Sequence, residues 1–120
     1  MQSEQPFRAQ ILRPQERVLV LALEGTLDIS SAARFKQLFL ESIGQGAQRV
    51  IVDLTKMTSL DSSGLGVLVG GAKRAAKGSL CLVCPDEAIT AIFAMVGIDR
   101  LVAVFASLQA ALASAAVATA

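Results

Sequence analysis

The 120-residue sequence contains no histidine, tryptophan or tyrosine. Without histidine, the chain lacks the commonest nitrogen ligand of zinc and the usual base of a serine nucleophile. Without tryptophan and tyrosine, it lacks most of the side chains on which nucleic-acid bases stack. Eleven basic and ten acidic residues give a formal net charge of +1, with no basic block, so direct binding of nucleic acid is disfavoured too. We therefore expect no metal, no cofactor and no ordinary enzymatic activity.

Long hydrophobic runs are also missing. No apolar segment reaches the roughly 18 residues that a membrane span needs. The first residues, MQSEQPFRAQ, hold no apolar stretch behind a basic start, which a signal peptide would require. We expect no membrane insertion, no signal peptide and a cytoplasmic location.

Cysteine is scarce, and its two copies form a C-x-x-C pattern at Cys81 and Cys84. Both lie in the apolar segment SLCLVCP, which is typical of a buried strand. Because strand side chains alternate between two faces, a separation of three residues directs the two thiols to opposite faces. We interpret both as small buried side chains, in preference to a redox or metal site.

Apolar side chains are plentiful. The sequence is 53% hydrophobic and 18% charged, with a mean hydropathy of +0.58. Such a chain is too apolar for intrinsic disorder and can bury a core, and its length fits one domain. We expect a single domain over residues 1–120, with its core at about 7–112 and an alanine-rich end, 113–120, that frays.

Segments typical of strands alternate with segments of helical periodicity. Strands are predicted at residues 7–12, 17–24, 49–54, 80–84 and 101–105, with a turn at 13–15. Helices are predicted from Ser30 or Ser31 to Gly44 or Gly46, from Ser62 to about residue 76, from Asp86 to Val96, and from Ser107 onward. This order indicates βαβ crossovers, and thus an α/β domain with a mixed, largely parallel sheet of about five strands and about four helices.

The most informative segment, residues 50–70, runs from a buried strand through a polar loop to a glycine-bearing helix start. The glycines from 64 to 71 read G-x-G-x-x-x-G-G, one residue longer than the dinucleotide fingerprint, and the chain has no G-K-[ST]. Ser62 and Ser63 do not lie in a G-x-S-x-G elbow, and no histidine exists to act as their base. Nucleotide binding and serine hydrolase chemistry are both disfavoured.

Two interpretations of this segment stay open. An aspartate or serine here can simply cap the helix, a contact worth about 1 kcal/mol in many proteins. Yet glycine inside a helix costs roughly 1 kcal/mol relative to alanine, so the three glycines at 66, 70 and 71 suggest that another backbone comes close. It belongs either to a partner protein or to a neighbouring helix of this chain. The outward strip of the helix is predicted to hold Ser62, Ser63, Gly66, Val67, Gly70 and Arg74.

Three landmarks resemble the STAS domain of bacterial anti-sigma factor antagonists. The segment LDSSGLGVL at 60–68, preceded by VIVDL at 50–54, looks like the signature of that family. The segment LEGTLD at 23–28 resembles its second landmark. Its C-terminal pattern is matched by VGID at 96–99, VF at 104–105 and LQAA at 108–111. The resemblance covers nearly the whole chain, from about residue 7 to residue 112.

The resemblance implies protein–protein switching rather than catalysis. Members bind an anti-sigma factor that is also a serine/threonine kinase, and so free the sigma factor that it sequestered. The kinase then phosphorylates the serine after the aspartate, and a serine phosphatase reverses this. By position, the implied phosphoacceptor is Ser62, beside Asp61. The implied partner-binding residues are Asp28, Ser30, Ser31, Asp61, Ser62, Ser63, Gly64, Gly66, Val67 and Gly70.

A second function class is a non-catalytic STAS subunit of a membrane transporter or of a scaffold complex. The apolar, alanine-rich end at 110–120 favours it, because such a segment can pack on a partner. The sequence leaves open the oligomeric state and whether Ser63, Ser59 or Thr58 also accepts phosphate.

Overall fold

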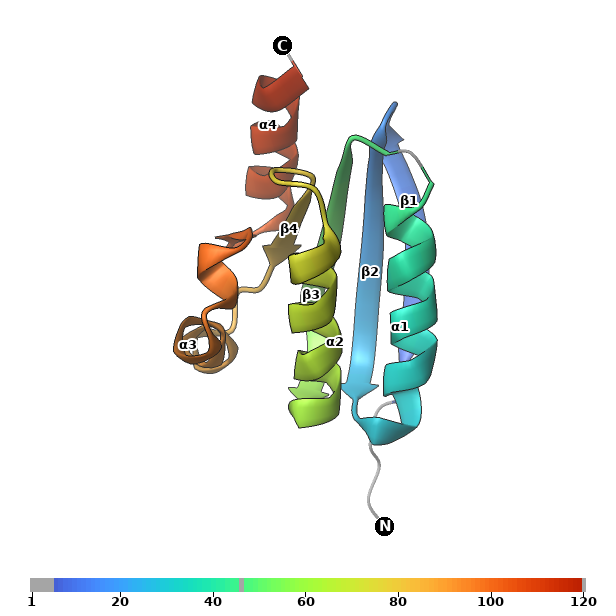
Figure 1. The fold of residues 1–120 in the computed structure, drawn as a ribbon, viewed down its shortest axis with the longest axis vertical. Coiled ribbons are helices and arrows are strands. Elements are labelled where there is room, and N and C mark those ends of the chain that lie inside the picture. Colours follow the sequence, from blue (N-terminus) through green and yellow to red (C-terminus); the bar gives the residue numbers. More distant parts are fainter. Residues whose placement is uncertain (1–5, 46, 120) are drawn as a thin grey trace.

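One five-stranded sheet, in the order β1-β2-β3-β4-β5, forms the centre of the molecule (Figure 1). The computed structural model describes residues 6–45 and 47–119. Its strands are β1 Arg8–Gln15, β2 Val18–Leu27, β3 Arg49–Leu60, β4 Leu80–Val83 and β5 Ala103–Phe105. Only β1 and β2 pair antiparallel, and the other three pairs of neighbours are parallel. The predicted mixed, largely parallel sheet is confirmed.

Four α-helices connect or follow the strands: α1 Ile29–Ile43, α2 Ser62–Arg74, α3 Glu87–Val96 and α4 Leu108–Thr119. The first three each begin after an aspartate N-cap whose side chain accepts backbone N–H groups. The predicted end of α3 at Gly97 is confirmed, since this glycine has a φ of 81°, the left-handed conformation that often ends a helix. The predicted cap of α4 at Ser107 is also confirmed, because its hydroxyl accepts the N–H of Ala110 at 3.1 Å.

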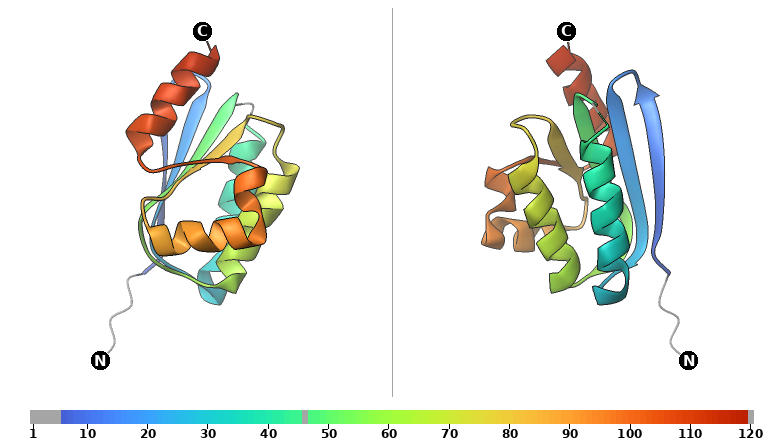
Figure 2. Two further views of the ribbon diagram at one scale, coloured as in Figure 1. Left: turned by 90° about the vertical axis from the view of Figure 1, so that its left-hand side faces the viewer. Right: turned by 45° about the vertical axis from the view of Figure 1, so that its right-hand side comes forward.

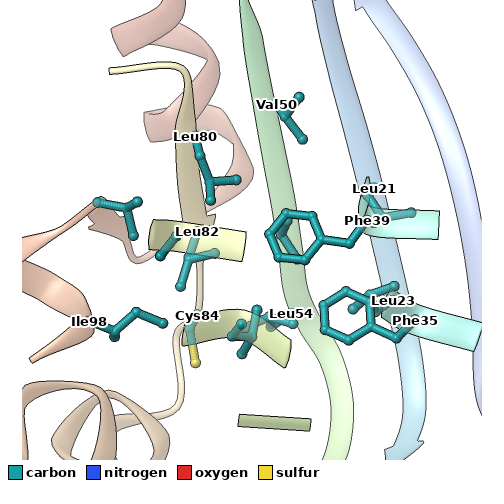
Figure 3. Packing of buried hydrophobic residues seen from close by; sticks show 14 of the residues in the cluster. Leu21, Leu23, Phe35, Phe39, Val50, Leu54, Leu80, Leu82, Cys84 and Ile98 are labelled. Carbon is teal, nitrogen blue, oxygen red and sulfur yellow. The ribbon is translucent and has the colours of Figure 1, made fainter. Parts of the chain in front are cut away.

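The two faces of the sheet carry separate hydrophobic cores. On one face, α1 and α2 lie side by side over β2 and β3, and Phe35 and Phe39 of α1 pack on Leu21 and Leu23 (Figure 3). On the other face, Ala111 of α4 packs against a smaller cluster that includes Val18, Val20, Ile51, Cys81 and Val83. Figure 2 shows α4 on the opposite side of the sheet from α1 and α2.

The two cysteines lie on opposite faces, as predicted. Cys81 belongs to the cluster under α4, and Cys84 belongs to the cluster under α1 and α2. Both are free thiols and are 0% and 3% exposed. Burial raises the pKa of each thiol, so both favour the protonated form.

Several predicted boundaries are wrong, among them the end of β2, which continues through Gly25 to Leu27 because it pairs with β3 beyond residue 24. Strand β3 does not end at residue 54 in a polar loop but continues to Leu60, because its second half pairs with β2 through two register shifts. The first turn lies after Gln15, with Arg17 at a φ of 75°, and not at residues 13–15. Strand β5 begins at Ala103, because residues 98–100 form a short 3-10 helix.

A further boundary that differs is the start of α1. Its N-cap is Asp28, not Ser30 or Ser31, because the Asp28 carboxylate accepts the N–H of Ser30 and the Ser31 hydroxyl accepts the N–H of Asp28. The helix ends at Gly44, the first of its two predicted ends, while residue 46 lies outside the described residues.

The ends of the chain are described in part. Helix α4 runs to Thr119, so the fraying predicted for 113–120 and the core limits of 7–112 stay predictions. The absence of a signal peptide is predicted from residues 1–10, of which 1–5 lie outside the described residues, as does residue 120. Within the described ranges, every helix is too short or too polar to span a lipid bilayer.

Candidate functional site

The candidate site lies where β2 and β3 end beside each other. Leu27 and Leu60 are register partners at the ends of these strands, and an aspartate follows each of them. The N–H of Asp61 donates to the carbonyl oxygen of Leu27 at 3.1 Å, which ties the two strand ends together. Helices α1 and α2 therefore both begin at the same edge of the sheet, at the lower end in Figure 1.

Asp61 caps α2 and leaves Ser62 free. Its Oδ1 accepts the N–H groups of Ser63 at 2.9 Å and Gly64 at 3.2 Å. Ser62 is the first residue of the helix and is exposed, and within the described residues its hydroxyl forms no hydrogen bond. The Ser62 hydroxyl is thus not needed as a cap and faces solvent.

Asp28 organises the neighbouring helix start. Its Oδ1 accepts the N–H of Ser30 at 2.9 Å and the Ser30 hydroxyl at 2.6 Å. The Ser30 hydroxyl is the main cause that holds the pKa of Asp28 below its usual value, so this carboxylate stays ionised to lower pH than an ordinary aspartate. The edge therefore carries two aspartate side chains, Asp28 and Asp61, one at the start of each helix.

The ten implied partner-binding residues lie together along this edge and α2, but at different depths. Eight of them are exposed or half-buried. Ser31 is 7% exposed, and its hydroxyl donates to the carbonyl oxygen of Thr26 at 3.0 Å. Gly64 is buried, and a Cβ there would lie 2.5 Å from Cγ of Leu27. Ser31 and Gly64 thus support the edge from below its surface in this structure, and their part in partner binding stays a prediction.

The two interpretations of the α2 glycines each apply to different residues. A Cβ on Gly71 would lie 2.1 Å from Cε2 of Phe39, so this glycine is required by the packing of α1 within the chain. Gly66 and Gly70 have nothing within 4 Å of an added Cβ. Internal packing therefore explains Gly71 but not the two outward-facing glycines.

Two features of the site were missed by sequence reasoning. Ile29 lies between Asp28 and Ser30 and is 79% exposed, which is unusual for a large aliphatic side chain. A hollow of about 270 Å³ lies between α1 and α2, and α1 contributes Lys36, Phe39 and Leu40 to it. The only sequence signal for the hollow is the order of the elements, because two successive βα units usually place their helices side by side.

A larger hollow, of about 800 Å³, lies elsewhere. It is lined mainly by β1, β2, β3 and the start of α4. Its lining includes side chains of both charges, namely Arg8, Lys56, Glu24 and Asp53. None of the implied partner-binding residues lines it. In the described part of the chain, no cluster of three or more cysteine, aspartate or glutamate side chains could hold a metal ion.

These features define an α/β domain that presents two aspartate-capped helix starts and an exposed serine at one edge of its sheet. A comparison with protein families matches residues 10–111 to the STAS domain. The chain therefore belongs to the STAS domain family.

Individual relatives agree with this assignment. The chain is 30% identical over 100 residues to a protein of Thermotoga neapolitana named "Putative anti-sigma factor antagonist TM1081 homolog", covering 81% of this chain and 88% of the relative. Its fold is similar to that of an anti-sigma factor antagonist from Mycobacterium paratuberculosis, with a TM-score of 0.82, 19% identity and coverage of 91% and 93% of the two chains. It is also similar to the Bacillus cell fate determinant SpoIIAA in its phosphorylated form, with a TM-score of 0.68, 20% identity and coverage of 90% and 99%.

Proposed function

We propose that this protein is a cytoplasmic, non-catalytic anti-sigma factor antagonist that binds an anti-sigma factor with serine/threonine kinase activity. Phosphorylation of Ser62 by that kinase ends the binding, and a serine phosphatase restores it. The protein thereby regulates sigma-dependent transcription by partner switching. The observation that carries the proposal is the exposed Ser62 hydroxyl, which takes no part in capping α2. The names of the relatives and the phosphorylated form of SpoIIAA support it.

The fold can accept a phosphate at this position. A phosphoryl group adds about −1.5 to −2 charges at pH 7, and the N-terminal end of a helix favours negative charge. Because the Ser62 side chain makes no hydrogen bond within the described chain, no internal contact is lost. Phosphorylation is therefore expected to leave the domain folded.

A docked partner is affected differently. Across an interface, a phosphate on Ser62 lies beside the Asp61 carboxylate and has to be desolvated with little cationic compensation. An ill-paired charge buried in an interface costs roughly 2–5 kcal/mol. One modification can thus change the affinity for the partner without changing the fold.

The docking face also offers apolar contact. Ile29 is 79% exposed and lies between Asp28 and Ser30, two of the implied partner-binding residues. Burying a side chain of this size against a partner contributes about 1.5–3 kcal/mol. We propose Ile29 as an anchor of the interface, next to the charged residues that set its orientation.

We expect Ile29→Ala to weaken binding of the cognate anti-sigma factor about tenfold or more, and to leave the free energy of unfolding nearly unchanged because the side chain is 79% exposed. Isothermal titration calorimetry and urea unfolding measure the two effects. The matched control is Met95→Ala on α3, where the side chain is 84% exposed but lies outside the candidate site. Equal affinities of the two variants would argue against this docking face.

The alternative function is a non-catalytic subunit of a membrane transporter or of a scaffold complex. The observation that favours it is the alanine-rich helix α4, whose first half has exposed alanines at 110 and 113. A pull-down from the source cells separates the two functions. Recovery of an anti-sigma factor supports the first, whereas recovery of an ATP-binding cassette protein supports the second.

A further inference from the structure

The hollow between α1 and α2 has the size of a side-chain socket. Its volume is about 270 Å³, below the range of roughly 300–1,000 Å³ that is typical of small-molecule pockets. Its floor is apolar, formed by Phe39, Leu40 and Val67 together with backbone at Gly70 and Gly71. Such a shape fits one or two aliphatic side chains of another protein better than a free metabolite.

Outward-facing glycines let a partner come close to this hollow. Gly66 and Gly70 are four residues apart on α2, line the hollow and have nothing within 4 Å of an added Cβ. Both are in the interior of α2, where alanine would be more favourable by up to about 1 kcal/mol. The open backbone offers a flat wall along the hollow.

The charged side chains that line the hollow are positively charged. Lys36 of α1 and Arg74 of α2 line it and are both exposed, and none of the described residues that line it carries a carboxylate. In the described chain, the acidic residue nearest to Lys36 in the sequence is Glu41, and its carboxylate accepts a hydrogen bond from Gln37 at 3.3 Å. The two cations are therefore free to meet carboxylates of a partner.

The hollow is continuous with the candidate site. Ser63, the neighbour of Ser62, lines one end of it, and Arg74 in the last turn of α2 lines it too. The twelve residues from 63 to 74 are separated by eleven steps, which rise about 16 Å along a helix, enough for about three turns of a second helix. A partner segment that contacts Ser62 can thus extend along the groove.

We propose that the groove between α1 and α2 binds an acidic, amphipathic segment of the anti-sigma factor, whose aliphatic side chains enter the hollow while its carboxylates meet Lys36 and Arg74. This inference rests on the proposed function and adds the chemistry of the partner segment to it. It predicts that complex formation is sensitive to salt, because the charge pairs lie at the rim of the groove.

Charge reversal tests the proposal. Lys36→Glu and Arg74→Glu are each expected to weaken binding of the anti-sigma factor about 5- to 30-fold in calorimetry at low salt, and less at 0.5 M salt, an ionic strength at which rim charges are screened. The matched control is Lys77→Glu, which makes the same change of net charge at an exposed residue outside the hollow and is expected to change affinity less than about twofold. Circular dichroism checks that all three variants fold, and Lys36→Arg is expected to keep the wild-type affinity.

The outcomes separate this inference from the function on which it rests. If the wild-type protein does not bind the anti-sigma factor, the proposed function fails. If the wild-type protein binds, but Lys36→Glu and Arg74→Glu bind as Lys77→Glu does, the groove is not the docking site. If charge reversal strengthens binding, the partner segment is basic and the proposal is overturned.

Discussion

Replacing Ser62 with aspartate is expected to weaken binding of the anti-sigma factor by about 30-fold or more. The added carboxylate lies beside Asp61 at the start of α2, whereas the basic residues of this helix, Lys73 and Arg74, lie in its last turn. A desolvated charge of this kind costs roughly 2–5 kcal/mol, and each 1.4 kcal/mol corresponds to about tenfold in affinity. Isothermal titration calorimetry with the purified partner measures the change directly.

Ser62→Ala is the matched control for this substitution. It removes the hydroxyl without adding charge, and the hydroxyl makes no hydrogen bond within the described chain. Affinity within about threefold of wild type is expected, together with an unchanged unfolding midpoint. If Ser62→Asp binds as tightly as Ser62→Ala, negative charge at this position is not the switch.

The largest expected loss of stability follows from Gly71→Ala. The added methyl would lie 2.1 Å from Cε2 of Phe39, a ring that is 1% exposed and stacks on Phe35 at 5.3 Å between centroids. Overpacking of a core in this way costs about 1–3 kcal/mol. Urea unfolding should show a lower midpoint with an unchanged slope.

Gly70→Ala is the adjacent control, and its effect should have the opposite sign. A Cβ at residue 70 meets nothing within 4 Å, so the gain in helix propensity of up to about 1 kcal/mol is not offset by a clash. A destabilised Gly70→Ala, or a Gly71→Ala protein as stable as wild type, would contradict the described packing of α1 on α2.

The elements were predictable where local chemistry decides them. Asp86 and Gly97 delimit α3, and the alternation of strand side chains directs Cys81 and Cys84 to opposite faces. The second half of β3 was not predictable, because its apolar pattern stops at Leu54 and only the pairing with β2 extends the strand to Leu60. Long-range pairing overrides local pattern there.

Some features of the candidate site were likewise predictable from the sequence, and others were not. The sequence motif predicts that Ser62 lies beside an aspartate at a helix start, and Asp61 is indeed the N-cap of α2. The match to the STAS domain confirms the family that the motif indicates. The burial of Ser31 was not predictable, because it arises where α1 packs against β2, and there its hydroxyl donates to the carbonyl oxygen of Thr26. Lys36 and Leu40 enter the hollow only because α1 lies beside α2, an arrangement that no local pattern contains.

The proposed switch is tested most directly by mapping phosphate after incubation of the protein with the cognate kinase and ATP. Mass spectrometry of the intact protein and of its peptides is expected to show one phosphate, on Ser62, in step with dissociation of the complex. The Ser63→Ala protein should be modified to the same extent, and the Ser62→Ala protein not at all. Phosphate confined to Ser63, Ser59 or Thr58, or no phosphate while the kinase remains active on its own substrate, would contradict the account.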